Sequence, residues 1–421
     1  MSSLNLRSIA TRCTLLFSLL FTVKFWYLGG GDVVSYYPYI SPDGFDWYLE
    51  GAYLIKSLAG ANLPALPVLR PPVFVLVTAA DFIFGGGGLI LGAIGGLTIF
   101  GAYYFVVKII DTFFTEDGGD SWCAIPIAIG SCIYPLNFIK PFILADSLAM
   151  TLSLASVFAL VRCYQKWQVR VLISSTILAA LAGLTQTYAL IPFLLASSLA
   201  IFYSFFDAKK RILEYFLALV SASAFFLLVT VAWRINIPHI TTPENFTLLK
   251  LSGNMFNFYI KTWSFYFLPL ILFFVFSKSY EVTCDFKKYV SAMSATLAAI
   301  FGLLCFFYQW PEARFTYYMW PWLMIFFFSS VRPQKKSGSK LIIVLMLILV
   351  VLVPTNYWEP SWDSIQPKLV RNWVGNYFTA VRVDRKFDLC GDDCVGKNDF
   401  LQNSDPYVNS TVKLYQQIKD L

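Results

Sequence analysis

Apolar stretches of about 20 residues recur along most of this chain, and they constrain its fold more than any other feature. A helix needs about 20 mainly apolar residues to cross a bilayer. Of the 421 residues, 57% are hydrophobic and only 14% are charged, whereas an average soluble domain has about 25% charged residues. We therefore predict an all-α, polytopic membrane protein. The composition excludes a soluble globular protein, a disordered chain and a DNA-binding domain.

Eleven stretches have the length and composition expected of membrane spans. They are residues 10–28, 88–110, 122–138, 141–162, 170–188, 190–206, 212–233, 262–277, 289–308, 316–331 and 341–354. A twelfth apolar stretch, 72–86, begins at Pro71-Pro72 and ends in a glycine run. Prolines suit the start of a helix and glycines suit its end, but this stretch is short for a full crossing. It could therefore be a span or a helix lying in the interface.

The distribution of Lys and Arg decides between these alternatives, because cytoplasmic loops carry an excess of both residues. If 72–86 stays on the outer side, sixteen basic residues lie on cytoplasmic segments and seven on outer segments before the tail. If it crossed the membrane, every later loop would invert and the basic clusters would face outward. The sequence therefore predicts eleven spans in a plasma or inner membrane. The N-terminus is predicted to be cytoplasmic, the first span an uncleaved anchor and the C-terminus extracytoplasmic.

The composition changes sharply near residue 355. Residues 1–355 form the predicted transmembrane domain, with a first outer loop at 29–87, and residues 356–421 form a polar tail long enough for a small outer module. The tail contains Cys390 and Cys394 in the sequence DLCGDDC. A disulfide between them is compatible with an outer compartment, and two free thiols are the alternative.

Ionisable side chains on the outer side are candidates for function, because charge at membrane depth is costly and usually functional. Asp43 and Asp46 lie three residues apart in SPDGFDWYLEG, and on a helix they would share one face. Helix capping and solvation in a loop are the ordinary alternatives for both. The outer cations that could hold an anion such as a phosphate are Arg70, Lys140, Arg234 and Arg314. Snorkelling of the same side chains to the interface is the alternative for these four.

Other chemistries have little support in the sequence. It contains no Walker loop, no GxGxxG before a helix, no HExxH and no GxSxG. With a single histidine, His239, it offers little basis for imidazole catalysis or a His-rich metal site.

The ordered set of motifs resembles the GT-C superfamily of polytopic glycosyltransferases. The closest likeness is to the branch of the protein O-mannosyltransferases and the lipid A aminoarabinose transferases. The segments that carry it are Asp43 to Tyr48, Arg70-Pro71-Pro72, ILADSLAMTLSLASVFAL at 143–160, AGLTQTYALIPFLL at 182–195, AWRIN at 232–236 and EARFTYYMWPWL at 312–323. The likeness extends in order over residues 10 to 331. Two positions depart from the family pattern: Gln186 stands where a basic residue is usual, and Gly44 follows the first acid where Glu is common.

The resemblance implies an enzyme that takes a sugar from a polyprenyl-phosphate carrier in the lipid bilayer. It would transfer the sugar, with inversion, to a hydroxyl of a protein, lipid or glycan acceptor on the outer face. Asp43 takes the role of general base, and Asp46 is the alternative. Asp146 would position the acceptor or orient a cation, and Glu312 is a second candidate for an acceptor or orienting role. The four outer cations are candidates for the carrier phosphate.

No cofactor is strictly required for this reaction, because the donor bond is already activated, although an acid pair can also hold a divalent cation. Two other functions fit the general pattern of spans. One is a transporter or flippase for a lipid-linked or small polar substrate, and the other is a non-catalytic subunit on the same fold.

Overall fold

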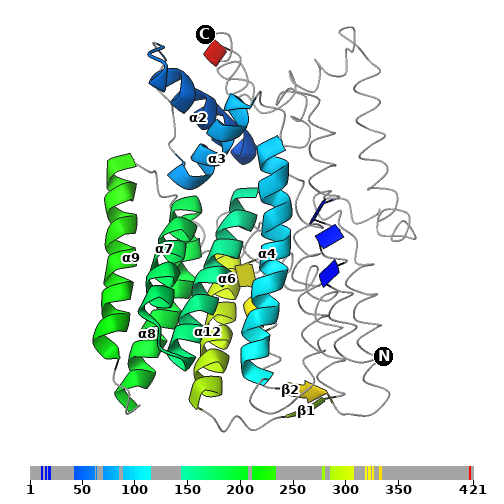
Figure 1. The fold of residues 1–421 in the computed structure, drawn as a ribbon, viewed down its shortest axis with the longest axis vertical. Coiled ribbons are helices and arrows are strands. Elements are labelled where there is room, and N and C mark those ends of the chain that lie inside the picture. Colours follow the sequence, from blue (N-terminus) through cyan, green and yellow to red (C-terminus); the bar gives the residue numbers. More distant parts are fainter. Residues whose placement is uncertain are drawn as a thin grey trace, which may run out of the picture.

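The protein is represented by a computed structural model in which the larger described segments are helical (Figure 1). The described residues are 11–12, 15–16, 18–19, 42–61, 63, 70–84, 89–114, 144–206, 211–233, 277–279, 285–307, 318–319, 321–323, 325–326, 331–333 and 417–418. The predicted all-α class is confirmed for these residues except for one short antiparallel ribbon. Its strands are β1 (Ser277–Ser279) and β2 (Val331–Pro333), with Lys278 opposite Arg332. Both strands come from segments that the sequence places on the cytoplasmic side.

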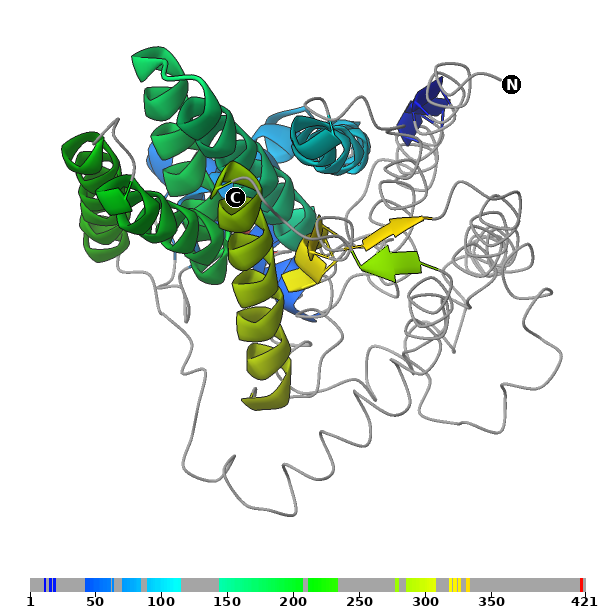
Figure 2. The ribbon, with the colours of Figure 1, turned by 90° about the horizontal axis from the view of Figure 1, so that it is seen from below.

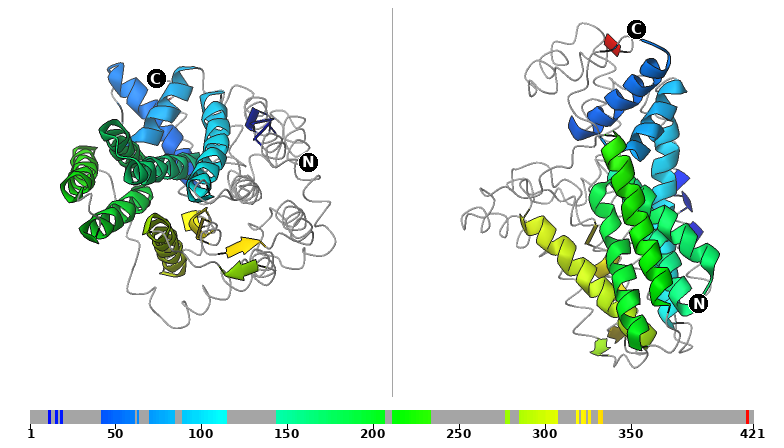
Figure 3. Two further views of the ribbon diagram at one scale, coloured as in Figure 1. Left: turned by 60° about the horizontal axis from the view of Figure 1, so that its bottom comes forward. Right: turned by 90° about the vertical axis from the view of Figure 1, so that its left-hand side faces the viewer.

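A helical bundle forms most of the described structure. Its elements are α4 (Leu89–Phe114), α6 (Leu144–Gln165), α7 (Val169–Thr185), the 3-10 helix η3 (Thr187–Leu190), α8 (Ile191–Phe206), α9 (Ile212–Trp233) and α12 (Asp285–Phe307). A short turn joins α6 to α7, so these two helices are antiparallel neighbours, and η3 turns the chain from α7 into α8. Seen from below and from the side, α12 crosses the bundle at a marked tilt (Figures 2 and 3).

Four stretches of this bundle are long and apolar enough to cross a bilayer. They are Leu89–Ile110, Ala145–Gln165, Thr187–Phe206 and Ile212–Trp233. They coincide with four of the predicted spans, and they indicate a membrane-embedded protein. Two more predicted spans correspond to α7, which has 17 residues, and to α12, which has 23.

The remaining predicted spans lie outside the described residues or are described only in fragments. They are 10–28, 122–138, 262–277, 316–331 and 341–354. The count of eleven, the orientation of the termini and the outer module at 356–421 therefore stay predictions.

Two further helices, α2 (Pro42–Leu58) and α3 (Pro72–Ile83), pack together across one end of the bundle (Figures 1 and 3). The 12 residues of α3 extend over about 18 Å at 1.5 Å per residue, whereas the hydrocarbon core is about 30 Å thick. The helix follows Pro71 and begins with Pro72, in agreement with the preference of proline for the first helical position. The helix α3 is therefore shorter than a full crossing requires, and the location of 72–86 on the outer side stays a prediction.

The contact between α2 and α3 depends on a glycine. The hydroxyl of Thr78 donates a hydrogen bond of 2.7 Å to the carbonyl of Trp47, and the rings of Trp47 and Phe74 meet edge to face at 5.2 Å. A Cβ atom on Gly51 would lie 2.5 Å from the Thr78 hydroxyl oxygen and 2.6 Å from the backbone nitrogen of Ala79. The backbones of the two helices can approach this closely only because residue 51 has no side chain.

Small and hydroxylated residues also hold the bundle helices together. The hydroxyls of Ser156 and Ser175 donate to each other's backbone carbonyls at 2.8 and 2.7 Å, which joins α6 to α7 by a reciprocal pair. The hydroxyl of Thr151 donates to the carbonyl of Thr98 at 2.9 Å and so joins α6 to α4. Such residues are typical of helix interfaces inside membranes, where close approach replaces the hydrophobic driving force.

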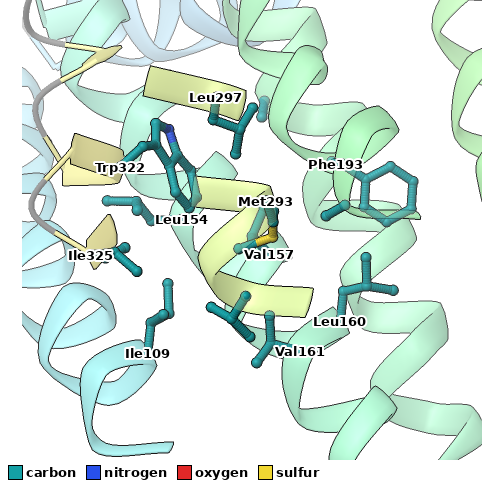
Figure 4. Packing of buried hydrophobic residues seen from close by; sticks show 14 of the residues in the cluster. Ile109, Leu154, Val157, Leu160, Val161, Phe193, Met293, Leu297, Trp322 and Ile325 are labelled. Carbon is teal, nitrogen blue, oxygen red and sulfur yellow. The ribbon is translucent and has the colours of Figure 1, made fainter. Parts of the chain in front are cut away.

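Large apolar side chains fill the space between α6, α12 and the described part of residues 318–326. Leu154 and Val157 of α6 lie close to Met293 and Leu297 of α12, and Trp322 inserts beside them (Figure 4). All five side chains are fully buried. This packing fixes residues 318–326 against the middle of α6.

The two ends of the described bundle carry different charged residues. The end covered by α2 and α3 contains the buried acids Glu50, Asp81 and Asp146. The described cations of the opposite end are Lys108, Arg162, Lys166, Arg170, Arg211, Lys287 and Lys288. Which of the two ends faces outward stays a prediction.

Replacing Gly51 tests the close approach of α2 and α3. We expect Gly51→Ala to lower the free energy of unfolding by about 1–3 kcal/mol, the usual cost of overpacking, because the new methyl group meets backbone atoms of α3. Chemical unfolding of the protein in mild detergent measures this change. Ser57→Ala, an exposed position on the same helix, is the control and should be close to neutral. Equal stability of the two variants would contradict the packing described above.

Candidate functional site

The predicted site residues that fall within the described structure share one end of the molecule. Asp43 and Asp46 lie in the first two turns of α2, which begins at Pro42. Arg70 lies just before α3, and Asp146 lies in the first turn of α6. Lys140, Glu312, Arg234, Arg314, Cys390 and Cys394 lie outside the described residues. The side chains of Asp43 and Asp46 are also outside them, so their roles stay predictions.

Glu50 ties α2 to the segment that carries Arg70. Both carboxylate oxygens of Glu50 accept the backbone N–H of Arg70, at 2.7 and 2.8 Å, and Glu50 is buried. Residues three, four and seven apart lie on one face of a helix. Helical periodicity therefore puts Asp43 and Asp46 on the same face of α2 as Glu50. Of these three acids, Glu50 is the one that contacts the Arg70 segment.

Asp81 fixes the start of α4. One of its carboxylate oxygens accepts the backbone N–H groups of Ile90 and Leu91, at 2.9 and 3.4 Å. The first N–H groups of a helix have no partner within the helix, and a negative charge there is favourable. Asp81 lies near the end of α3 and is 1% exposed. Its two hydrogen bonds therefore hold the end of α3 against the start of α4.

Asp146 is the centre of a three-residue cluster that joins distant segments. The hydroxyls of Tyr188 and Tyr318 donate to the same carboxylate oxygen of Asp146, at 2.8 and 2.9 Å. Tyr318 also approaches the Asp146 backbone carbonyl at 3.2 Å. The two tyrosine rings meet edge to face at 4.9 Å, and all three residues are buried. The first turn of α6, the turn η3 and residue 318 are therefore held together by one carboxylate.

These contacts compensate for the cost of burying negative charge. A carboxylate placed in an apolar environment without hydrogen bonds is strongly destabilising, and hydrogen bonds to a charged group are stronger than those between neutral groups. Two phenolic donors therefore hold Asp146 in one orientation. This arrangement suits a residue that orients another group, which is the role that the sequence predicts for Asp146.

Sequence reasoning missed both tyrosines. Tyr188 lies two residues after Gln186 in LTQTYAL, and Tyr318 lies in ARFTYYMW, so each belongs to a motif that the analysis singled out for other residues. In a chain with 24 Tyr, no local signal distinguishes these two. The placement of both in family-like motifs was the one available indication.

Metal binding has no support in the part of the chain that is described. No group of three or more His, Cys, Asp or Glu residues there could hold a metal ion. The predicted divalent-cation alternative concerns Asp43 and Asp46, and it stays a prediction.

Comparison of the chain with protein-family models, with curated proteins and with solved structures finds no match.

Removing one donor from Asp146 tests whether the cluster holds the three segments together. We expect Tyr188→Phe and Tyr318→Phe each to lower the free energy of unfolding by about 1.5–3 kcal/mol, the usual value for a hydrogen bond to a charged group. Unfolding by denaturant in mild detergent measures it.

The control for both variants is Tyr203→Phe. Tyr203 is partly buried and makes ring contacts with Phe202 and Tyr289, so its replacement preserves the ring and removes a hydroxyl elsewhere in the bundle. The cluster would be unimportant if Tyr318→Phe proved as stable as Tyr203→Phe.

Proposed function

We propose that the protein is a membrane glycosyltransferase that moves a sugar from a polyprenyl-phosphate carrier to a hydroxyl acceptor on the outer face of the membrane. One observation carries this proposal. The helix that contains Asp43 and Asp46 is fixed across the end of the bundle, and Glu50 ties it to the segment of Arg70. A carboxylate that can take up a proton and a cation that can bind a phosphate therefore come from adjoining elements at one end.

The proposed reaction uses these groups in a single displacement. The carboxylate of Asp43 accepts the proton of the acceptor hydroxyl, whose oxygen attacks the anomeric carbon of the sugar. The bond between that carbon and the phosphate oxygen breaks on the opposite face, so the configuration inverts. The polyprenyl phosphate leaves with the electron pair of that bond, and a cation such as Arg70 stabilises its charge. The isoprenoid chain stays in the lipid.

The neighbouring elements support the same location for the other predicted residues. Lys140 precedes α6 by four residues and Arg234 directly follows α9, and both of these helix ends lie at the end of the bundle covered by α2 and α3 (Figure 1). Glu312 and Arg314 precede Tyr318, whose hydroxyl binds Asp146.

A transporter is less well supported. Substrate sites of secondary transporters usually lie near the middle of the membrane, whereas the buried acids of the described residues lie at one end of the bundle. A glycosyltransferase accounts for the acids at this end better than a transporter does.

Replacing the proposed base tests the reaction. We expect Asp43→Asn to lower the transfer rate by about 100- to 10,000-fold, the usual contribution of a general base, while membrane insertion and the unfolding midpoint stay unchanged. The assay follows radiolabelled sugar from a panel of polyprenyl-phosphate donors to acceptors in membranes of the expressing cells.

Two further variants interpret the result. Asp46→Asn examines the alternative base, and Glu214→Gln removes an acid from the opposite end of the bundle and should leave the rate unchanged. Loss of activity in Asp46→Asn alone would move the role of base to Asp46. Full activity in both Asp43→Asn and Asp46→Asn would refute the proposed mechanism.

The proposed phosphate contact makes a separate prediction for Arg70. We expect Arg70→Gln to raise the KM for the donor at least about tenfold, because charge-assisted hydrogen bonds to the phosphate are lost. The KM for the acceptor should change little. Glu50 binds the backbone N–H of Arg70, so the variant keeps this anchor of the segment. Steady-state kinetics with both substrates varied measures the two constants, and an equal rise in both would indicate a structural role.

A further inference from the structure

The end of the bundle opposite α2 and α3 gathers the starts of three helices around one aromatic ring. Tyr164, near the end of α6, stacks on Tyr289 of α12 at 4.7 Å and contacts Phe286 at 6.3 Å. Its ring also lies 6.2 Å from that of Tyr215 in the first turn of α9. Trp167, in the turn before α7, meets the same Tyr215 ring edge to face at 6.1 Å. The first turns of α7, α9 and α12 are therefore neighbours.

Basic residues occupy the helix ends that carry this aromatic cluster. Arg162, Lys166, Arg170 and Lys288 are exposed at the ends of the same helices. The guanidinium group of Arg211 lies over the ring of Trp167 at 4.5 Å and pairs with Glu214 at 3.1 Å. That pair involves one oxygen of Glu214, and a guanidinium has five N–H donors, so Arg211 can bind a further anion. Stacking on Trp167 orients it for this purpose.

The helix starts add positive potential to the same place. The N-cap residue of α7, Gln168, makes no side-chain hydrogen bond to the helix. The first N–H groups of a helix point away from its body and carry the positive end of the helix dipole. In α7 these groups lie beside Lys166 and Arg170, so the cations and the backbone favour an anion at one location.

An exposed apolar stripe begins at this location and runs up the outside of the bundle. On α7 it consists of Val169, Ile173 and Ile177, which are 54%, 54% and 55% exposed at a spacing of four residues. On the neighbouring α9, Leu213 and Leu217 are 65% and 52% exposed. Exposed apolar residues therefore follow the cations on two helices that pack against each other.

We propose that this end binds an anionic glycerophospholipid, with its phosphate at Lys166, Arg170 and Arg211 and its acyl chains along α7 and α9. Charge alone would suit any anion, but the apolar stripe that begins at the cations fits an amphiphile. Basic clusters at the ends of membrane helices suit anionic headgroups. The inference is independent of the reaction proposed above, because its residues lie at the opposite end of the bundle.

Lipid binding to the purified full-length protein tests the proposal. The probes are phosphatidylglycerol and phosphatidylcholine with identical acyl chains, titrated in detergent and followed by native mass spectrometry and by the unfolding midpoint. We expect phosphatidylglycerol to bind at least about tenfold more tightly than phosphatidylcholine. We also expect its affinity, but not that of phosphatidylcholine, to fall as salt is raised.

Matched variants locate the site. Lys166→Gln combined with Arg170→Gln should weaken phosphatidylglycerol binding about 25-fold, because each basic residue near a membrane surface contributes roughly fivefold. The control combines Lys56→Gln with Lys108→Gln and removes the same charge outside the cluster. Lys108 lies over the ring of Tyr104 on α4, and Lys56 lies at the end of α2. The control should retain the wild-type preference.

Three results would overturn the proposal. Equal affinity for the two lipids in the wild-type protein would remove the role of the headgroup charge. Equal loss in the two double variants would show that the cluster is not the site. Inorganic phosphate that raises the unfolding midpoint as much as phosphatidylglycerol does would indicate a site for a free anion and not for a lipid.

Discussion

A carboxylate that is buried at the end of a membrane-embedded bundle must receive hydrogen bonds from the protein. This requirement determines how one end of the molecule is built. Water is scarce there, so an unpaired polar group is costly. Glu50 accepts the backbone N–H of Arg70, Asp81 accepts the N–H groups that begin α4, and Asp146 accepts the hydroxyls of Tyr188 and Tyr318. Each acid therefore joins a helix to another segment.

The three connections hold in place the elements that carry the proposed site. Catalytic groups are effective only when the elements that carry them are held in position. The middle of α2 is held through Glu50 and through the close contact at Gly51. The first turn of α6 is held through Asp146. The predicted base thus lies on a helix that other, buried residues hold in place, whereas the predicted orienting residue, Asp146, itself makes the contacts that hold its helix.

The helices were predictable from sequence to a greater extent than the site. The predicted span 212–233 coincides with α9, and the predicted span 141–162 overlaps α6 with both ends shifted by three residues. Such agreement is possible because apolar composition and helix length are local properties. The helical structure of α3 and its short length also followed from local composition, since prolines precede it and glycines follow it. The partners of Asp146 did not follow, since Tyr188 and Tyr318 lie 42 and 172 residues away along the chain. Contacts at such separation depend on the packing of the whole bundle, for which a single sequence contains no local signal.

The same electrostatic rule explains why the two ends of the bundle differ. Acids at one end are buried and bonded to backbone and tyrosine donors, so they can be kept in the interior. Most of the cations at the other end are exposed, and Arg211 is held by an aromatic ring and by Glu214. Long basic side chains can remain at a charged lipid surface without losing hydration, whereas a short carboxylate near hydrocarbon must find its partners within the protein. The acidic end therefore acquires fixed geometry, and the basic end remains open to ligands from the membrane.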